Sequence, residues 1–144
     1  MNISFYTPEG KVNEELYDKV AKEIAGGLIS TETNQSGQPR PRGVTKSQLR
    51  RIYDEVKRLE KLLDQGRQWE DILPLVKMVK AKTAYATARM KANDRRNSKF
   101  FDHLDQFING CVAEVKTQKD FKVFALLFEA VYGFYYGLGG VQTQ

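Results

Sequence analysis

Reactive side chains are scarce in this chain, which has one cysteine and one histidine in 144 residues. A single cysteine, Cys111, excludes an internal disulfide and fits a reducing compartment, so we expect a cytoplasmic protein. One cysteine and one histidine cannot supply any of the ligand spacings of a zinc site. A catalytic pair would need Cys111 and His103, which would lie about 12 Å apart along one helix, too far for proton transfer.

Long hydrophobic runs are missing as well. The longest apolar stretch, residues 124–138, is interrupted by Glu129 and Gly133 and is shorter than the roughly 20 residues of a membrane-spanning helix. The acidic residues occur as sequence neighbours, such as Glu14 and Glu15, which diverge by about 100° on a helix and do not converge on a substrate. The glycine-rich segments lack the phosphate-loop pattern. The sequence therefore predicts no enzyme, no cofactor and no metal site.

Positive charge is abundant and unevenly distributed. The net charge is +5 and the pI about 9.3. Residues 40–61 contain eight bases and three acids, and residues 77–99 contain eight bases and one acid. Two basic segments in the middle of the chain are typical of a protein that binds a polyanion such as nucleic acid. The alternative is a solvated surface that only keeps the protein in solution.

Hydrophobic periodicity predicts an all-α fold, a single compact bundle of about five helices in one domain, residues 1–144. We expect a flexible loop at about 30–44, a loose tail at 137–144 and no sheet, with residues 2–7 as the one possible strand. Asp71 and Asp120 are the expected caps of the third and fifth helices. The third helix has two apolar faces, which predicts a central position in the bundle. The expected helices span residues 13–28, 45–65, 71–92, 98–115 and 120–137.

The second expected helix divides its residues between two faces. Thr45 and Gln48 form a capping box at its start. Apolar residues from Leu49 to Leu63 follow on one face. Another face carries four cations within roughly 60° of one another, over roughly 22 Å. We call them the cationic stripe: Lys46, Arg50, Lys57 and Lys61.

Lysine and arginine neutralise phosphates without reading base sequence, so these cations are candidates for RNA binding. The alternative for the stripe is a solvated helix face with ion pairs such as Arg50 to Asp54. The cations Arg95, Arg96 and Lys99, at a helix junction, are a further candidate group. The predicted RNA-binding residues are Arg40, Arg42, Lys46, Arg50, Arg51, Lys57, Arg58, Lys61, Lys80, Lys82 and Arg89.

Three segments carry a family resemblance: residues 45–56, the alanine- and lysine-rich residues 80–89, and the phenylalanine-rich residues 121–131. Together they resemble the small subunit of the type III-A CRISPR effector, the Csm complex. The resemblance covers roughly residues 13–136. It departs at residues 133–136, Gly-Phe-Tyr-Tyr, where the family often has Ala-Tyr-His, so no role of that histidine is carried over.

The resemblance implies a helical, non-catalytic subunit that lines up in several copies and holds the backbone of the guide–target RNA. Its expected partners are guide RNA, target RNA, other Csm subunits and copies of itself, and no membrane. The family pattern maps onto Lys46, Arg50, Arg51, Lys80, Lys82 and Arg89 as RNA-facing or fold-supporting positions.

Two other functions remain open from the residues alone. One is a stand-alone helical nucleic-acid-binding regulator, although the second helix lacks the preceding helix and tight turn of a helix-turn-helix motif. The other is a basic helical adaptor for an acidic protein. Surplus aromatic residues at positions 132–136 further suggest self-association.

Overall fold

The computed structural model describes residues 1–33, 35–38 and 40–142 and is 69% helical, which confirms the all-α prediction. Residues 34 and 39 of the expected loop and 143–144 of the expected tail lie outside the described residues. Two short 3₁₀ helices, η1 (Glu14–Tyr17) and η2 (Arg95–Asn97), accompany five α-helices. The α-helices are α1 (Lys19–Gly26), α2 (Lys46–Asp64), α3 (Trp69–Asn93), α4 (Ser98–Glu114) and α5 (Gln118–Gly137).

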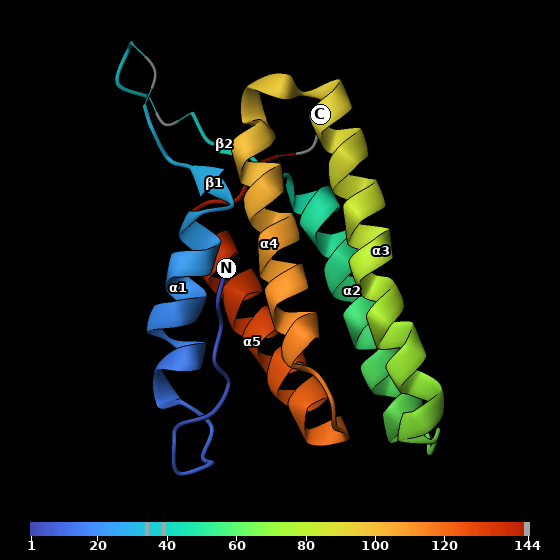
Figure 1. The fold of residues 1–144 in the computed structure, drawn as a ribbon. Helices are drawn as coiled ribbons and strands as arrows, with labels where there is room; N and C mark the ends of the chain where they lie inside the picture. The colour runs from blue at the N-terminus through green and yellow to red at the C-terminus, as the bar shows by residue number, and fades with distance from the viewer. Residues whose placement is uncertain (34, 39, 143–144) are drawn as a thin grey trace.

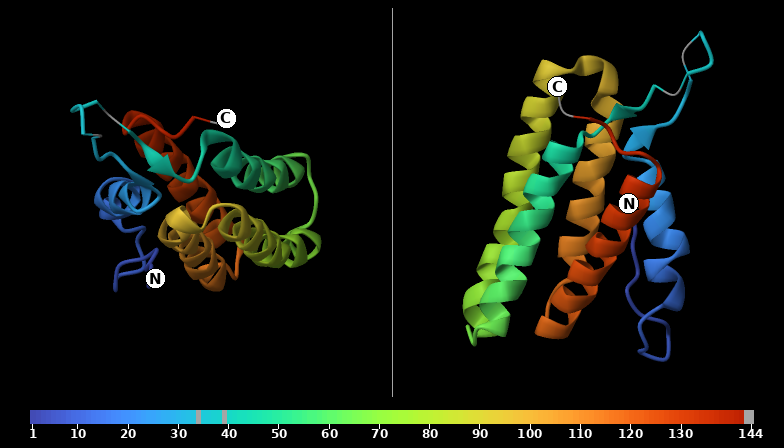
Figure 2. Two further views of the ribbon diagram at one scale, coloured as in Figure 1. Left: turned by 90° about the horizontal axis from the view of Figure 1, so that it is seen from above. Right: turned by 180° about the vertical axis from the view of Figure 1, so that it is seen from behind.

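The helices form two layers around one core (Figures 1 and 2). Helices α1, α4 and α3 lie side by side in front, while α5 and α2 lie behind them. Helix α3 packs against α4 and α2, and α5 packs against α1 and α2. Helices α2 and α4 begin, and helix α3 ends, at the same end of the bundle (Figure 1).

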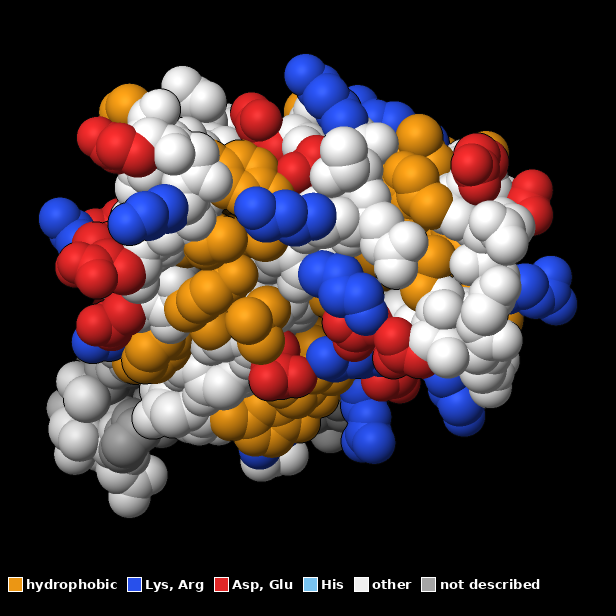
Figure 3. All heavy atoms as spheres, turned by 90° about the horizontal axis from the view of Figure 1, so that it is seen from below, with side chains coloured by type: hydrophobic (Ala, Val, Ile, Leu, Met, Phe, Trp, Pro, Cys, Tyr) orange, Lys and Arg blue, Asp and Glu red, His pale blue; other side chains and the backbone are white. Residues whose placement is uncertain are grey.

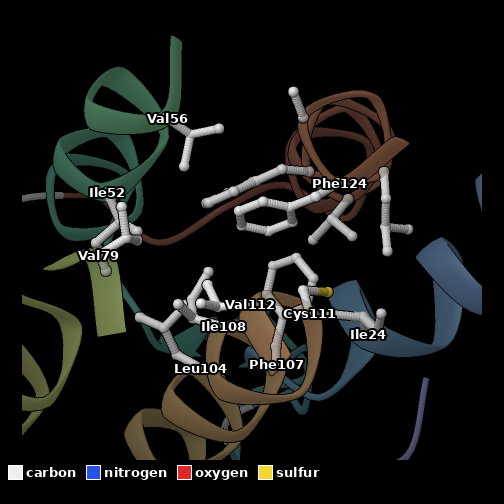
Figure 4. Packing of buried hydrophobic residues seen from close by; sticks show 14 of the residues in the cluster. Ile24, Ile52, Val56, Val79, Leu104, Phe107, Ile108, Cys111, Val112 and Phe124 are labelled. Carbon is white, nitrogen blue, oxygen red and sulfur yellow. The ribbon is translucent and has the colours of Figure 1, made fainter. Parts of the chain in front are cut away.

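Aromatic rings from α4 and α5 fill the centre of the bundle (Figure 4). Phe107 meets Phe124 and Phe128 edge to face, with ring centroids 6.5 and 5.3 Å apart. Helix α2 adds Leu49, Val56 and Leu59, all fully buried, as its periodicity predicts. Its capping box is also confirmed: the Gln48 N–H donates to Thr45 Oγ1 over 3.2 Å, and the Thr45 N–H donates to Gln48 Oε1 over 2.9 Å.

A small antiparallel sheet corrects the expectation of no sheet. Strands β1 (Ile29–Ser30) and β2 (Arg42–Gly43) pair Ile29 with Gly43 and Ser30 with Arg42. The pair closes the base of the expected loop and gives hydrogen-bond partners to its backbone groups. Strands of two residues are too short to show alternation in the sequence. An isolated bridge between Tyr6 and Val12 also lies near the expected strand at 2–7.

Three helix starts differ from the predicted ones. The first helix is broken at Asp18, whose backbone leaves the helical region between η1 and α1. Helix α3 begins at Trp69, so Asp71 lies in its first turn instead of capping it. Helix α5 is capped by Thr117, with Asp120 as the third residue of a second capping box. In α3 and α5 the acid still faces the positive end of the helix dipole.

The second apolar face of α3 is exposed, so the prediction of a central α3 was wrong. Met78 and Tyr85 are 49% and 67% exposed, and Leu75 on the same side is also exposed. Helix α3 lies at an edge of the bundle and contacts only α2, α4 and the short η2 extensively. Alanine and methionine favour helix formation wherever they lie, so apolar periodicity alone did not reveal which face is covered.

Tyr135 joins three segments at the end of the bundle where α2 begins. Its hydroxyl donates to the Val44 carbonyl oxygen over 2.6 Å and accepts from the Val141 N–H over 3.0 Å. Val141 in turn accepts from the Lys46 N–H over 2.8 Å. One buried side chain thus holds the end of α5, the segment before α2 and the C-terminal segment together.

We predict that Tyr135→Phe lowers the free energy of unfolding by about 1–3 kcal/mol, because it leaves the Val44 carbonyl and the Val141 N–H without their partner. Denaturant unfolding would measure the change. Tyr136→Phe is the matched control, since Tyr136 is exposed, and it should change stability by less than about 0.5 kcal/mol. Equal effects of the two variants would contradict the role of the Tyr135 hydroxyl.

Asp120 links the N-terminal segment to the start of α5. Tyr6 Oη donates to its Oδ1 over 2.5 Å, and the N–H groups of Lys116 and Thr117 donate to its Oδ2, each over 3.0 Å. Partial burial alone would raise the pKa of Asp120, but the hydrogen bonds from Tyr6, Lys116 and Thr117 outweigh it and lower the pKa. Burial and the same carboxylate raise the pKa of Tyr6 to about 12.

A carboxyl group with a lowered pKa stabilises the fold above its unfolded-state pKa, and this stability is lost as the pH falls through its folded-state pKa. Asp120→Asn should therefore be less stable than the parent at neutral pH, with the gap closing below about pH 4. Urea midpoints from pH 3 to 7 would measure it. The control is Glu9→Gln, at an exposed acid outside the helices, which should change the free energy of unfolding at neutral pH by less than about 0.5 kcal/mol. A constant gap for Asp120→Asn would refute the linkage.

Candidate nucleic-acid interface

The cationic stripe lies along the side of α2 that faces α5. Lys57 is the most tightly held of its members: its Nζ lies 2.9 Å from Glu129 of α5 and 3.2 Å from Glu60. Burial alone would lower the pKa of Lys57, but the hydrogen bonds to Glu129 and Glu60 outweigh it and raise the pKa. Lys57 therefore ties α2 to α5 and is already neutralised.

The other stripe residues are held less firmly. Arg50 lies 3.8 Å from Asp54, and both side chains are well exposed. Lys46 Nζ lies over the Tyr136 ring, 5.2 Å from its centroid. Lys61 is exposed and has no ion pair within the described part of the chain. Exposed pairs such as Arg50 to Asp54 contribute under about 1 kcal/mol, so Arg50 can exchange its carboxylate for a phosphate.

A second group of cations lies on the side of α2 that faces α3. Glu55 accepts from Arg58 Nη2 over 2.8 Å and from Lys82 Nζ over 3.0 Å. The hydrogen bond from Arg58, with a smaller contribution from Lys82, holds the pKa of Glu55 below its ordinary value. One carboxylate thus bridges α2 and α3 and leaves one excess positive charge among the three side chains.

Beyond this bridge the two helices enclose a cavity of about 500 Å³, the α2–α3 cavity. Its floor is apolar, and its rim carries the guanidinium groups of Arg51 and Arg89. Neither arginine forms an ion pair with any described residue, and Arg89 lies over the exposed ring of Tyr85, 5.7 Å from its centroid. The lining residues are Thr45, Ser47, Gln48, Arg51, Ile52, Tyr85, Ala86, Arg89, Met90, Asn93 and Asp94.

The predicted loop residues line a second cavity, of about 480 Å³, which we call the loop cavity. Arg40, Arg42 and Arg96 meet there, although Arg96 is more than fifty positions further along the chain. Arg42 also bonds Asn97 over 3.2 Å and lies 3.8 Å from Glu32. The sequence left the loop arginines and the helix junction as separate candidates. The loop cavity is lined by Glu32, Thr33, Gln35, Ser36, Arg40, Arg42 and Arg96.

The residues that line the two cavities come from segments toward the end of the bundle where α2 and α4 begin. This end is at the top of Figure 1. Asp94 of the α2–α3 cavity is only two residues from Arg96 of the loop cavity. At the opposite end of the bundle, acidic and basic side chains are intermixed, with hydrophobic side chains between them (Figure 3). Five arginines line the two cavities at this end, whereas cations with no ion pair to a described residue occur at both ends of the bundle, Arg67 and Lys116 among them.

Not every predicted residue joins these groups. Lys80 is exposed, but it is about 160° around α3 from Lys82 and faces away from both cavities. Conversely, Tyr85 was outside the predicted set, and Arg96 belonged only to the further candidate group at the helix junction. A pattern search for aromatic residues beside arginine on an alanine-rich helix would have found Tyr85. No sequence signal placed Arg96 beside the loop.

Neither scarce reactive residue enters the interface. Cys111 is fully buried, and burial raises the pKa of its thiol well above its ordinary value. His103 is half-buried beside α1, and burial lowers its pKa. Among the described residues there is no group of three or more histidine, cysteine or acidic side chains that would hold a metal ion. The search of the same residues found no helix suited to crossing a membrane.

Fold and surface together define a small, basic, mostly helical protein in which five arginines line two cavities. The family model Csm2 Type III-A matches residues 16–137, so the chain belongs to this family, the small subunit of the type III-A Csm complex. Comparisons with curated proteins and with solved structures gave no significant match. The family match agrees with the resemblance in the second, third and fifth helices.

We predict that Lys57→Ala lowers the free energy of unfolding by about 1 kcal/mol, because it leaves Glu129 and Glu60 without their cation. The control is Lys61→Ala, which removes an exposed cation from the same face of α2 and should stay within about 0.5 kcal/mol of the parent. Chemical denaturation of both variants would measure this. A Lys61 variant as unstable as the Lys57 variant would contradict the structural assignment of Lys57.

Proposed function

We propose that this chain is a non-catalytic RNA-binding subunit of a type III-A CRISPR interference complex. Several copies would line up along the guide–target RNA and hold its backbone, beside the other Csm subunits that membership of the family implies. The observation that carries the proposal is the gathering of arginines around two cavities at one end of the bundle. Such an end offers several guanidinium groups to consecutive phosphates.

The predicted cations would contribute unequally. Arg40, Arg51 and Arg89 have no ion pair with a described residue, so binding RNA would break no ion pair of theirs with the described part of the chain. Arg42, Arg50, Arg58 and Lys82 are in exposed or half-exposed pairs that a phosphate can replace at small cost. Lys46, Lys61 and Lys80 extend the positive field along α2 and α3. Lys57 would contribute least, because two carboxylates hold it.

The proposed role is binding and not chemistry. The single histidine uses its Nε2 on the Ile24 carbonyl, 3.1 Å away, and the single cysteine is inaccessible. Lysine and arginine contacts with phosphates carry no sequence information, which suits a protein that must accept any guide. The exposed apolar side chains of α3, Leu75 and Met78, are of the kind that a neighbouring subunit would cover.

The test is a set of salt titrations of RNA binding. Removing Arg40, Arg51, Arg89 and Arg96 together should weaken binding to every RNA sequence alike. The slope of log K against log salt should fall by about 0.7 per lost phosphate contact on a single strand, so by nearly 3 for four. The matched control removes four cations from the opposite end, Lys11, Arg67, Lys116 and Lys119, and should leave the slope nearly unchanged.

A third variant, with Lys46, Arg50 and Lys61 changed to alanine, measures the contribution of the stripe separately from that of Lys57. Equal losses in the two four-residue variants would mean that only net charge matters, and the proposed interface would be wrong. Tighter binding to duplex DNA than to RNA would favour a stand-alone DNA-binding regulator. No binding to either nucleic acid would favour an adaptor for an acidic protein.

A further inference from the structure

The α2–α3 cavity has the size and the lining of a small-molecule site. Its volume of about 500 Å³ lies within the roughly 300–1,000 Å³ of ligand pockets. The floor is made of Ile52, Ala86 and Met90, and Ile52 and Met90 belong to the buried core. An apolar floor of this kind offers nothing to a phosphate, so a ligand that bears only charge leaves most of the cavity unused.

The rim supplies an aromatic surface. Tyr85 is the most exposed of the large apolar side chains at 67%, and it lies at the edge of the cavity beside the guanidinium group of Arg89. Proteins that bind single-stranded RNA stack unpaired bases on aromatic rings and arginine planes of this kind. An exposed tyrosine between an apolar floor and two free arginines therefore fits a base that carries a phosphate.

The charged side chains make the two ends of the cavity electrostatically different. Helices α2 and α3 run antiparallel, and the ion pair of Glu55 with Lys82 joins them just before the cavity, which puts Arg51 near Tyr85 and Ala86, and Thr45 near Asp94. Arg51 thus lies toward the end of the cavity nearest this ion pair, and Arg89 lies about one helical turn further along α3 than Tyr85. Asp94 lies at the other end, where its carboxylate accepts from Asn97 Nδ2 over 2.6 Å. A phosphate is attracted to the arginines and repelled by Asp94.

We propose that the α2–α3 cavity receives one unpaired nucleotide of the bound RNA, with its base between Tyr85 and the apolar floor and its phosphate on Arg51 and Arg89. This inference rests on the proposed RNA-binding function and adds a preference to it. A paired base is stacked inside the duplex and cannot enter a cavity between two helices, whereas a bulged or flipped base can. The protein would therefore prefer a duplex interrupted by an unpaired nucleotide.

The experiment compares two RNA duplexes that differ only in one bulged 2-aminopurine nucleotide. The parent should bind the bulged duplex several-fold more tightly than the perfect one, and 2-aminopurine fluorescence should be quenched as its base stacks on Tyr85. Tyr85→Ala should lower the affinity for the bulged duplex roughly 5- to 100-fold and leave that for the perfect duplex nearly unchanged. Tyr85→Phe, which keeps the ring, should behave like the parent.

Two further variants exclude trivial explanations. Met78→Ala removes another exposed apolar side chain of α3 that does not line the cavity and should change neither affinity. Ala86→Leu fills the cavity from its floor with every cation in place and should abolish the preference for the bulge. Equal affinity of the parent for the two duplexes, with unchanged fluorescence, would overturn this inference and leave the proposed function standing. No binding to either duplex would overturn both.

Discussion

The burial of one face of α2 is the constraint on which the rest of the structure depends. Leu49, Val56 and Leu59 are fully buried, and this fixes the rotation of the helix about its own axis. Once this apolar face of α2 points toward the core, the other residues of the helix must lie on its two flanks, one toward α5 and one toward α3. The division of the cations into the stripe and the α2–α3 group follows from the sequence spacing and this single rotation. A turn of α2 by one residue would move Lys57 away from Glu129 and bury a charge in place of this apolar face.

The end of the bundle that carries the two cavities is built from segments distant in the sequence. Tyr135 fixes Val44 and Val141 through one hydroxyl, and the pairing of β1 with β2 closes the loop before α2. Gly43 in β2 has a positive φ of 132°, and a Cβ there would lie 2.4 Å from the Leu28 carbonyl oxygen, so only glycine fits this crossing. These contacts bring the loop arginines to Arg96 and hold Thr45 where the α2–α3 cavity opens. The end of the bundle that carries the two cavities thus depends on buried, mostly uncharged contacts.

Features that depend on residue spacing within one segment could be predicted from the sequence. Features that depend on contacts between positions far apart in the sequence could not. The capping box of Thr45 and Gln48, the buried apolar face of α2 and the number of helices follow from spacing within one segment, and the structure confirms them. The pairing of Lys57 with Glu129 spans 72 positions, and no periodicity reports it. The exposed second face of α3 was misjudged because alanine and methionine are compatible with both a core and a surface. The loop cavity was missed because it forms only when β1 pairs with β2.

The cations differ in how easily each could exchange its present partner within the protein for a phosphate. Lys57 is half-buried between two carboxylates, so moving it to a phosphate would leave Glu129 and Glu60 without their cation. Exposed pairs such as Arg50 with Asp54 cost little to exchange. Arg51 and Arg89 have no acidic partner among the described residues and lose nothing. Under the proposed RNA binding, the cations of the N-terminal half of α2 would therefore exchange more easily than Lys57 in its middle, and so would Lys61, which has no ion pair with a described residue. The placement of the acids of α2, which all lie from Asp54 onward, and not the spacing of its bases, would set these differences among the cations.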